Sequence, residues 1–185
     1  MRWNGRIYEA ASALLERRAA CDLYHSALRV SVPPHVYVIE VTPVCNVPRG
    51  DRGVIGEGAV GARWAGRWRL FRYEVRCWRD GTIADVAEAV ASPQRITSDE
   101  TICRSVLARL PDVPIPVWGR DEMHAGEMWN SNSVVAWSLS SCGLNVDTIA
   151  PPTGGRAPGW NAGIVVGVTQ VASTMPAGSH PRRPG

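Results

Sequence analysis

The sequence predicts a single α+β domain in which an antiparallel β-sheet packs against a helix late in the chain. Strand-like runs of apolar and β-branched residues are concentrated between residues 23 and 78, and clear helical patterns follow residue 98. The length of 185 residues fits one domain, and we find no internal repeat. We therefore expect residues 1–172 to form one domain and residues 173–185 to form a disordered tail.

The first half of the chain is expected to hold one helix followed by several strands. Apolar residues recur at helical spacing over Ile7–Ala20. Pro33-Pro34 separates two strand-like runs, Leu23–Val32 and Val36–Thr42, which predicts a hairpin. Four further features are expected in order: a loop over 46–52, an irregular strand or close-approach loop over 53–61, a long strand over 68–78 with a bulge near Leu70, and a turn at Asp80-Gly81.

The second half is expected to hold two helices and a last strand. Ser98-Asp99 begins a helix that reaches about Leu110, and the following prolines force an extended segment. A second helix is expected from about Ser131 to Cys142, with Gly143 as its natural C′ residue. A loop rich in proline and glycine over 151–159 then leads into a strand over 163–172.

Composition narrows the classes of function. The net charge is only +3, which argues against a dedicated nucleic-acid binder. All 20 basic residues are arginine, which indicates a coding bias. The five cysteines are odd in number and widely spaced, which argues against a disulfide framework or a structural zinc site. No stretch reads as a signal peptide or a membrane span, so we expect a cytoplasmic protein. We also expect no cofactor and no metal, although His124 lies among carboxylates that would suit one.

The first candidate for chemistry is a histidine and a carboxylate on the predicted hairpin. With a turn at Pro33-Pro34, opposed residues sum to 67 and Glu40 is diagonal to His25; a tighter register would place them directly opposite. In either register the two side chains share one face of the hairpin. A carboxylate beside an imidazole fixes its tautomer and raises its basicity, as in a catalytic triad. The alternative is a solvated hairpin face with two polar residues.

The second candidate is the start of the late helix. Asn130, Ser131 and Asn132 are all good N-cap residues. A side chain at this point faces the positive end of the helix dipole, and the helix-start N–H groups can form an oxyanion hole. We expect Asn130 to act structurally, by capping the helix and fixing the direction of Ser131. The alternative for the whole segment is plain capping without chemistry.

The order of these motifs resembles the circularly permuted branch of the papain-like superfamily. The strings Tyr24-His25-Ser26-Ala27 and Val38-Ile39-Glu40-Val41 are similar to the pattern H-x-(A/G)-(I/L) followed by v-i-E. That branch includes NlpC-type amidases, lecithin retinol acyltransferase-like proteins and deSUMOylating isopeptidases, in which the late helix opens with N-C-x-x. The start Asn130-Ser131-Asn132-Ser133 and the later Pro151-Pro152 resemble an uncharacterised bacterial family with G-P-N-S-N-T-F-x-A at that point. The resemblance spans roughly residues 23–166 and implies a papain-like fold.

The chain departs from the resembling families at the nucleophile. Ser131 stands where the relatives have cysteine, and the nearest cysteine in the sequence, Cys142, falls at the far end of the helix. A serine needs a base to take its proton during attack, whereas a thiolate is accessible near neutral pH.

The resemblance therefore leaves two functions open. One is a papain-like cleft that has lost catalysis and binds a small molecule, peptide, glycan or lipid headgroup, with Asn130, Trp129 and Trp160 near the ligand. The other is an amide or ester hydrolase or acyltransferase, in which Ser131 attacks, His25 is the base and Glu40 orients His25.

Overall fold

The computed structural model describes residues 22–44, 52–83, 86 and 93–174. The helix predicted over 7–20 and most of the loop predicted over 46–52 lie outside them, as does the tail after residue 174. The elements in chain order are β1 (Asp22–Leu23), β2 (Leu28–Val32), β3 (His35–Pro43), β4 (Val54–Ala59), the 3-10 turns η2 (Arg63–Arg67) and η3 (Arg69–Phe71), β5 (Arg72–Arg79), α2 (Glu100–Arg109), the 3-10 turn η5 (Leu110–Asp112), α3 (Ser131–Ser140), β6 (Gly155–Arg156) and α4 (Trp160–Thr174).

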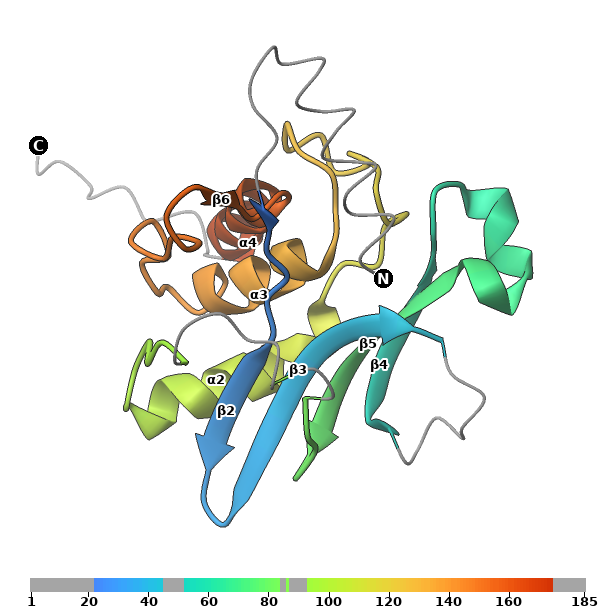
Figure 1. The fold of residues 1–185 in the computed structure, drawn as a ribbon. Coiled ribbons are helices and arrows are strands. Elements are labelled where there is room, and N and C mark those ends of the chain that lie inside the picture. The colour runs from blue at the N-terminus through green and yellow to red at the C-terminus, as the bar shows by residue number, and fades with distance from the viewer. Residues whose placement is uncertain (1–21, 45–51, 84–85, 87–92, 175–185) are drawn as a thin grey trace, which may run out of the picture.

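The chain is a mixed α+β protein built on an antiparallel sheet in the order β2-β3-β5-β4 (Figure 1). The hairpin of β2 and β3 turns at Pro33-Pro34 and pairs Leu28 with Ile39, which is the first of the two predicted registers, with a sum of 67. A register shift lies in β4, between Val54 and Gly56. The strands β1 and β6 form a separate short parallel pair.

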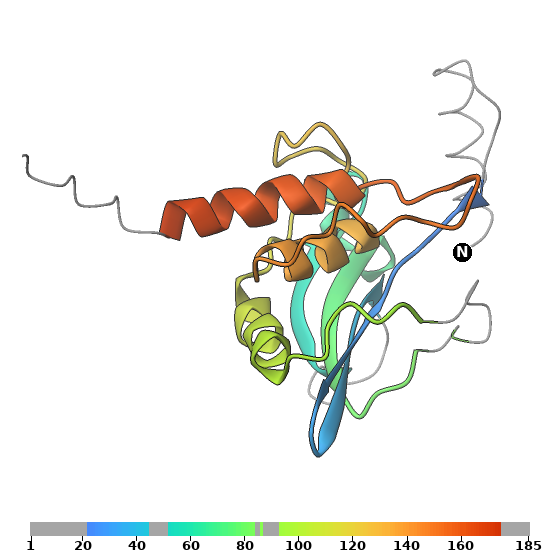
Figure 2. The same cartoon turned by 90° about the vertical axis from the view of Figure 1, so that its left-hand side faces the viewer.

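In the described part of the chain, α2 and α3 cover one face of this sheet, and α4 packs against α3. Figure 2 shows α3 lying between the sheet and α4, with α2 beside it. Ile39, Val41 and Val75 of the sheet pack in one core with Val134 and Trp137 of α3. All ten residues of α3 are buried, which is why its sequence has no polar face. Among the described residues, no helix combines the length and the apolar character needed to cross a bilayer.

The segment 163–172 is a helix, so the predicted last strand is wrong. Its run of β-branched residues favours a strand by propensity alone. However, Gly163 and Gly167 lie one turn apart on the face of α4 that meets α3. A Cβ at position 163 would collide with the carbonyl oxygen of Ser133, and one at 167 with the hydroxyl of Ser140. The close contact of the two helices, which only glycine permits, outweighs the local preference for a strand.

Two other predicted strands have different limits in the structure. The run Leu23–Val32 is divided into β1 and β2 by an extended segment over 24–27 that belongs to neither strand. The strand predicted over 68–78 begins only at Arg72, because residues 69–71 form the turn η3. The change of phase near Leu70 therefore marks the passage from turn to strand and not a bulge.

Candidate functional site

The structure brings His25 and Ser131 together at the start of α3. The Nδ1 atom of His25 lies 2.6 Å from the Oγ atom of Ser131, although the residues are 106 positions apart in the chain. Ser131 is 4% exposed, whereas His25 is an exposed residue. With the ring proton on Nε2, Nδ1 accepts the hydroxyl proton of Ser131. That is the geometry in which an imidazole acts as general base toward a serine.

Asn130 caps the start of α3, and the Ser131 hydroxyl takes no part in the cap. The Asn130 Oδ1 accepts hydrogen bonds from the backbone N–H groups of Asn132 at 2.9 Å and Ser133 at 3.4 Å. The Ser133 hydroxyl in turn accepts from the Asn130 N–H at 3.0 Å, which completes a capping box. The predicted structural role of Asn130 therefore matches the geometry, and Ser131 is the first helical residue, free to point its hydroxyl toward His25.

Asn132 holds the segment that carries His25. Its Oδ1 accepts a hydrogen bond from the Ser26 hydroxyl at 2.8 Å, and its Nδ2 donates to the Tyr24 carbonyl at 3.0 Å. One amide thus bonds both neighbours of His25. The Tyr24 N–H donates to the carbonyl of Arg156 at 2.8 Å, which extends the β1–β6 pairing to the edge of the site. His25 is therefore fixed by backbone and amide contacts on both sides, outside any strand of the main sheet.

The loop before α4 covers the helix start. The carbonyl of Pro158 accepts from the side-chain amides of Asn130 at 2.8 Å and Asn132 at 3.0 Å. The carbonyl of Gly159 accepts from the Ser133 hydroxyl at 2.7 Å. Gly159 has φ +82°, and a Cβ there would lie 2.7 Å from the Asn130 Oδ1. The glycine-rich loop that follows Pro151-Pro152 is therefore part of the site.

The start of α3 leaves one backbone donor without a protein acceptor among the described residues. Asn130 Oδ1 occupies the N–H groups of Asn132 and Ser133, and the Asn130 carbonyl accepts from Val134. Within the described part of the chain, the N–H of Ser131 donates to no protein acceptor. It lies at the positive end of the α3 dipole, beside its own hydroxyl. This donor is the one that a developing oxyanion on a bound acyl group would meet.

Glu40 does not share this site, which corrects the predicted triad. Its neighbours in β3, Ile39 and Val41, face the core beside α3, so the pleat directs Glu40 to the opposite face of the sheet. There its carboxylate accepts a hydrogen bond from Arg76 at 3.3 Å. The hairpin has one of the two predicted registers, but His25 precedes the paired part of β2. The alternation of side chains between the two faces of the sheet therefore does not place His25 on the face of Glu40. Because Nδ1 faces Ser131, a group that orients His25 would act through Nε2.

The two tryptophans predicted to touch a ligand lie in different surroundings. Trp129 is 1% exposed and belongs to the hydrophobic core, and its buried indole N–H has no acceptor in the described structure. Trp160 begins α4 and packs, half-buried, against a smaller cluster around Val135 and Leu139. Its indole N–H is buried and has no acceptor in the described structure. Trp160 therefore stays a candidate for a ligand contact.

The remaining candidate positions serve local structure. Asp121 near His124 accepts from the N–H groups of Ala125 and Gly126, and Glu122 pairs with Arg63. Among the described residues no group of three side chains is arranged to hold a metal ion. His35 pairs with Asp80 at 2.8 Å on the exposed hairpin end. Burial raises the pKa of the Cys77 thiol to about 11, which makes it a poor nucleophile.

Comparison with known proteins adds no relative. No family model, no curated protein and no solved structure matches this chain. The function of this protein is therefore inferred from the geometry of the site.

Proposed function

We propose that the protein is a serine-dependent amide or ester hydrolase or acyltransferase, of papain-like architecture, with Ser131 as nucleophile and His25 as general base. The contact of 2.6 Å between the Ser131 Oγ and the His25 Nδ1 carries the proposal. Core serines in helices ordinarily bond a backbone carbonyl of the preceding turn, as Ser138 does with Val134. Ser131 is instead held against an imidazole, and a separate residue performs the capping.

The reaction follows from these positions. Ser131 Oγ attacks the carbonyl carbon of the substrate while its proton passes to His25 Nδ1. The Ser131 N–H and the start of α3 stabilise the oxyanion. When the tetrahedral intermediate collapses, His25 gives the proton to the leaving amine or alcohol, and the acyl group stays on Ser131 as an ester. Water or an acceptor alcohol or amine, deprotonated by His25, then releases the acyl group and restores both residues.

Labelling with a fluorophosphonate tests the proposal. We expect one adduct on the native protein, located at Ser131 by peptide mass mapping and lost in both Ser131→Ala and His25→Ala. Ser105→Ala is the matched control, because Ser105 is an exposed serine that bonds the Thr101 carbonyl on α2. Labelling that survives Ser131→Ala, or that is unaffected by His25→Ala, would contradict the proposed roles.

A second function, ligand binding without turnover, is favoured by the burial of Ser131, of which only 4% is exposed. The variant Ser131→Cys separates the two. If the site activates a nucleophile, His25 should lower the pKa of the new thiol, and alkylation by iodoacetamide should persist well below pH 8. In Ser131→Cys/His25→Ala the thiol loses the neighbouring imidazole, and the pH midpoint of its alkylation should return to about 8.5. An inert thiol in the presence of His25, together with absent fluorophosphonate labelling, would favour a binding cleft.

A further inference from the structure

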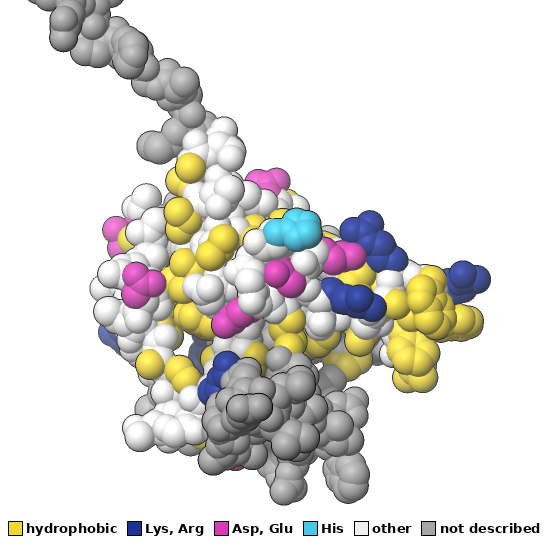
Figure 3. Space-filling view, turned by 90° about the horizontal axis from the view of Figure 1, so that it is seen from above, with side chains coloured by type: hydrophobic (Ala, Val, Ile, Leu, Met, Phe, Trp, Pro, Cys, Tyr) yellow, Lys and Arg dark blue, Asp and Glu magenta, His cyan; other side chains and the backbone are white. Residues whose placement is uncertain are grey.

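The segment that joins β4 to β5 carries large apolar side chains into solvent. Trp64 is 63% exposed, Trp68 50%, Leu70 84% and Phe71 44%. These four residues are called the aromatic tip below. The turns η2 and η3 project from the end of the sheet, away from the helices (Figure 1). In the space-filling view hydrophobic side chains gather on this projection with arginine side chains at its margin (Figure 3).

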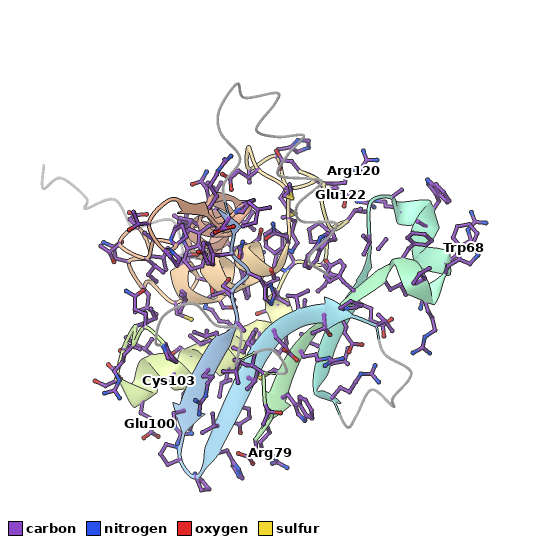
Figure 4. All side chains as sticks on the ribbon, viewed as in Figure 1. Trp68, Arg79, Glu100, Cys103, Arg120 and Glu122 are labelled. Atoms are coloured by element: carbon purple, nitrogen blue, oxygen red, sulfur yellow. The ribbon has the colours of Figure 1, made fainter. Side chains whose placement is uncertain are left out.

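The aromatic tip is an ordered projection. The backbone bonds from Ala65 N–H to the Ala62 carbonyl and from Trp68 N–H to the Ala65 carbonyl close the first turn, and Ala65 is buried beneath it. The rings contact one another edge to face, with centroids 5.7 Å apart for Trp64 and Trp68 and 6.4 Å apart for Trp68 and Phe71. In Figure 4 Trp68 lies at the outermost edge of the molecule, pointing away from the sheet. The apolar side chains are thus presented together, with little freedom left to lose on binding.

The charged residues of this segment are all basic. Residues 61–72 contain four arginines and no acidic residue. The two at its base are tied to the body: Arg63 pairs with Glu122 at 2.8 Å, and Arg72 with Glu57 at 3.6 Å. Arg67 lies over the Trp68 ring, with its guanidinium carbon 5.6 Å from the ring centroid. The tip therefore presents apolar rings with cationic groups beside them.

We propose that the aromatic tip docks the protein on the surface of an anionic lipid bilayer. Tryptophan is enriched at the membrane–water interface, where an amphipathic ring suits the headgroup level, and arginine is drawn to anionic headgroups. A convex projection inserts into a deformable bilayer, whereas a protein partner would need a matching concavity. Single-stranded nucleic acid is bound in a positively charged groove with open ring faces, whereas these rings stand on a projection and Arg67 lies over the Trp68 ring. The proposal does not depend on the chemistry of Ser131.

Sedimentation of the full chain with vesicles tests this docking. We expect the protein to bind vesicles of phosphatidylcholine and phosphatidylglycerol (about 3:1), to bind pure phosphatidylcholine more weakly, and to dissociate as salt rises. The double variant Trp68→Ser/Leu70→Ser should lose at least about tenfold in partition coefficient on the mixed vesicles, because both side chains would insert into the interface. Arg67→Gln should lose roughly fivefold on anionic vesicles alone.

The control is Val168→Ser, which changes a 55% exposed apolar residue on α4, away from the tip. Val168→Ser and Ser131→Ala should both bind vesicles as the unchanged protein does. Because all of the altered side chains at the tip are exposed, the thermal melts of the tip variants should coincide with that of the unchanged protein. Failure of the unchanged protein to bind mixed vesicles would overturn the proposal, as would a Trp68→Ser/Leu70→Ser variant that binds normally. Tip-dependent binding to an oligothymidylate without vesicle binding would also overturn it, in favour of nucleic acid.

Discussion

Buried polar side chains gather in two regions of this molecule that differ in kind. Among the described residues, the buried charged ones are Glu40, Arg52, Glu74 and Arg76, on the sheet face opposite α3. The buried neutral ones all lie within residues 130–141, along α3. In the first region Glu74, which is fully buried, accepts from Arg52 through both carboxylate oxygens at 2.9 Å and also from Arg76. The charged region is a chain of ion pairs whose groups neutralise one another.

In the neutral region the buried serine hydroxyls form hydrogen bonds with backbone carbonyls, with one exception. The hydroxyls of Ser133, Ser138, Ser140 and Ser141 all bond backbone carbonyls. Ser131 is the buried serine whose hydroxyl meets an imidazole. The comparison shows that buried polar groups do not by themselves indicate a functional site: the ion pairs hold the structure, and the reactive geometry is found where one group departs from the pattern of its neighbours.

The largest expected effect on the free energy of unfolding comes from a change in the charged region. Glu74→Gln removes the carboxylate shared by two buried guanidinium groups, and we expect it to lower the free energy of unfolding by about 3–5 kcal/mol. Chemical denaturation measures this. The control Glu100→Gln removes an exposed pair with Arg104 on α2 and should cost no more than about 0.5 kcal/mol. Equal effects of the two changes would show that the charged region does not hold the structure together.

The pH dependence of stability should follow the charged region. Burial tends to raise the pKa of Glu74, but the hydrogen bonds and charges of Arg52 and Arg76 outweigh it and lower the pKa. The unfolded chain therefore takes up this proton at a higher pH than the folded protein does. The contribution of Glu74 to stability is complete above the ordinary glutamate pKa of about 4.3 and is lost as the pH falls through the lower folded value. Melting curves between pH 3 and 6 should show a steeper acid loss for the unchanged protein than for Glu74→Gln.

The smallest expected effect lies within the helix start. Asn130→Ala should lower the free energy of unfolding by about 1 kcal/mol, because it removes the cap of α3. Ser131→Ala should cost less than about 0.5 kcal/mol, because the capping box stays intact. Thermal melts of the two variants provide the comparison. If Ser131→Ala were the more damaging change, its hydroxyl would serve the fold and the proposed nucleophile would lose its main support.

Local patterns predicted several elements closely. Pro33-Pro34 predicted the hairpin and limited its register to two alternatives, Asp99 proved to be the N-cap of α2, and Asn130 proved to be the N-cap of α3. These features depend on a few neighbouring residues and on backbone hydrogen bonds that any chain must satisfy at a turn or a helix end. The pairing of His25 with Ser131 was predicted from a resemblance in motif order, and spacing alone did not determine it.

The sequence by itself determined the α+β class, the hairpin and the capped helix start, because each rests on local periodicity or on the chemistry of one terminus. Only the tertiary structure decided three other points. The segment 163–172 is a helix because its glycines meet α3, Glu40 faces Arg76 and not His25, and Asn132 fixes His25 by bonding both of its neighbours. Each depends on residues far apart in the chain, and their contacts exist only after the sheet and helices have packed.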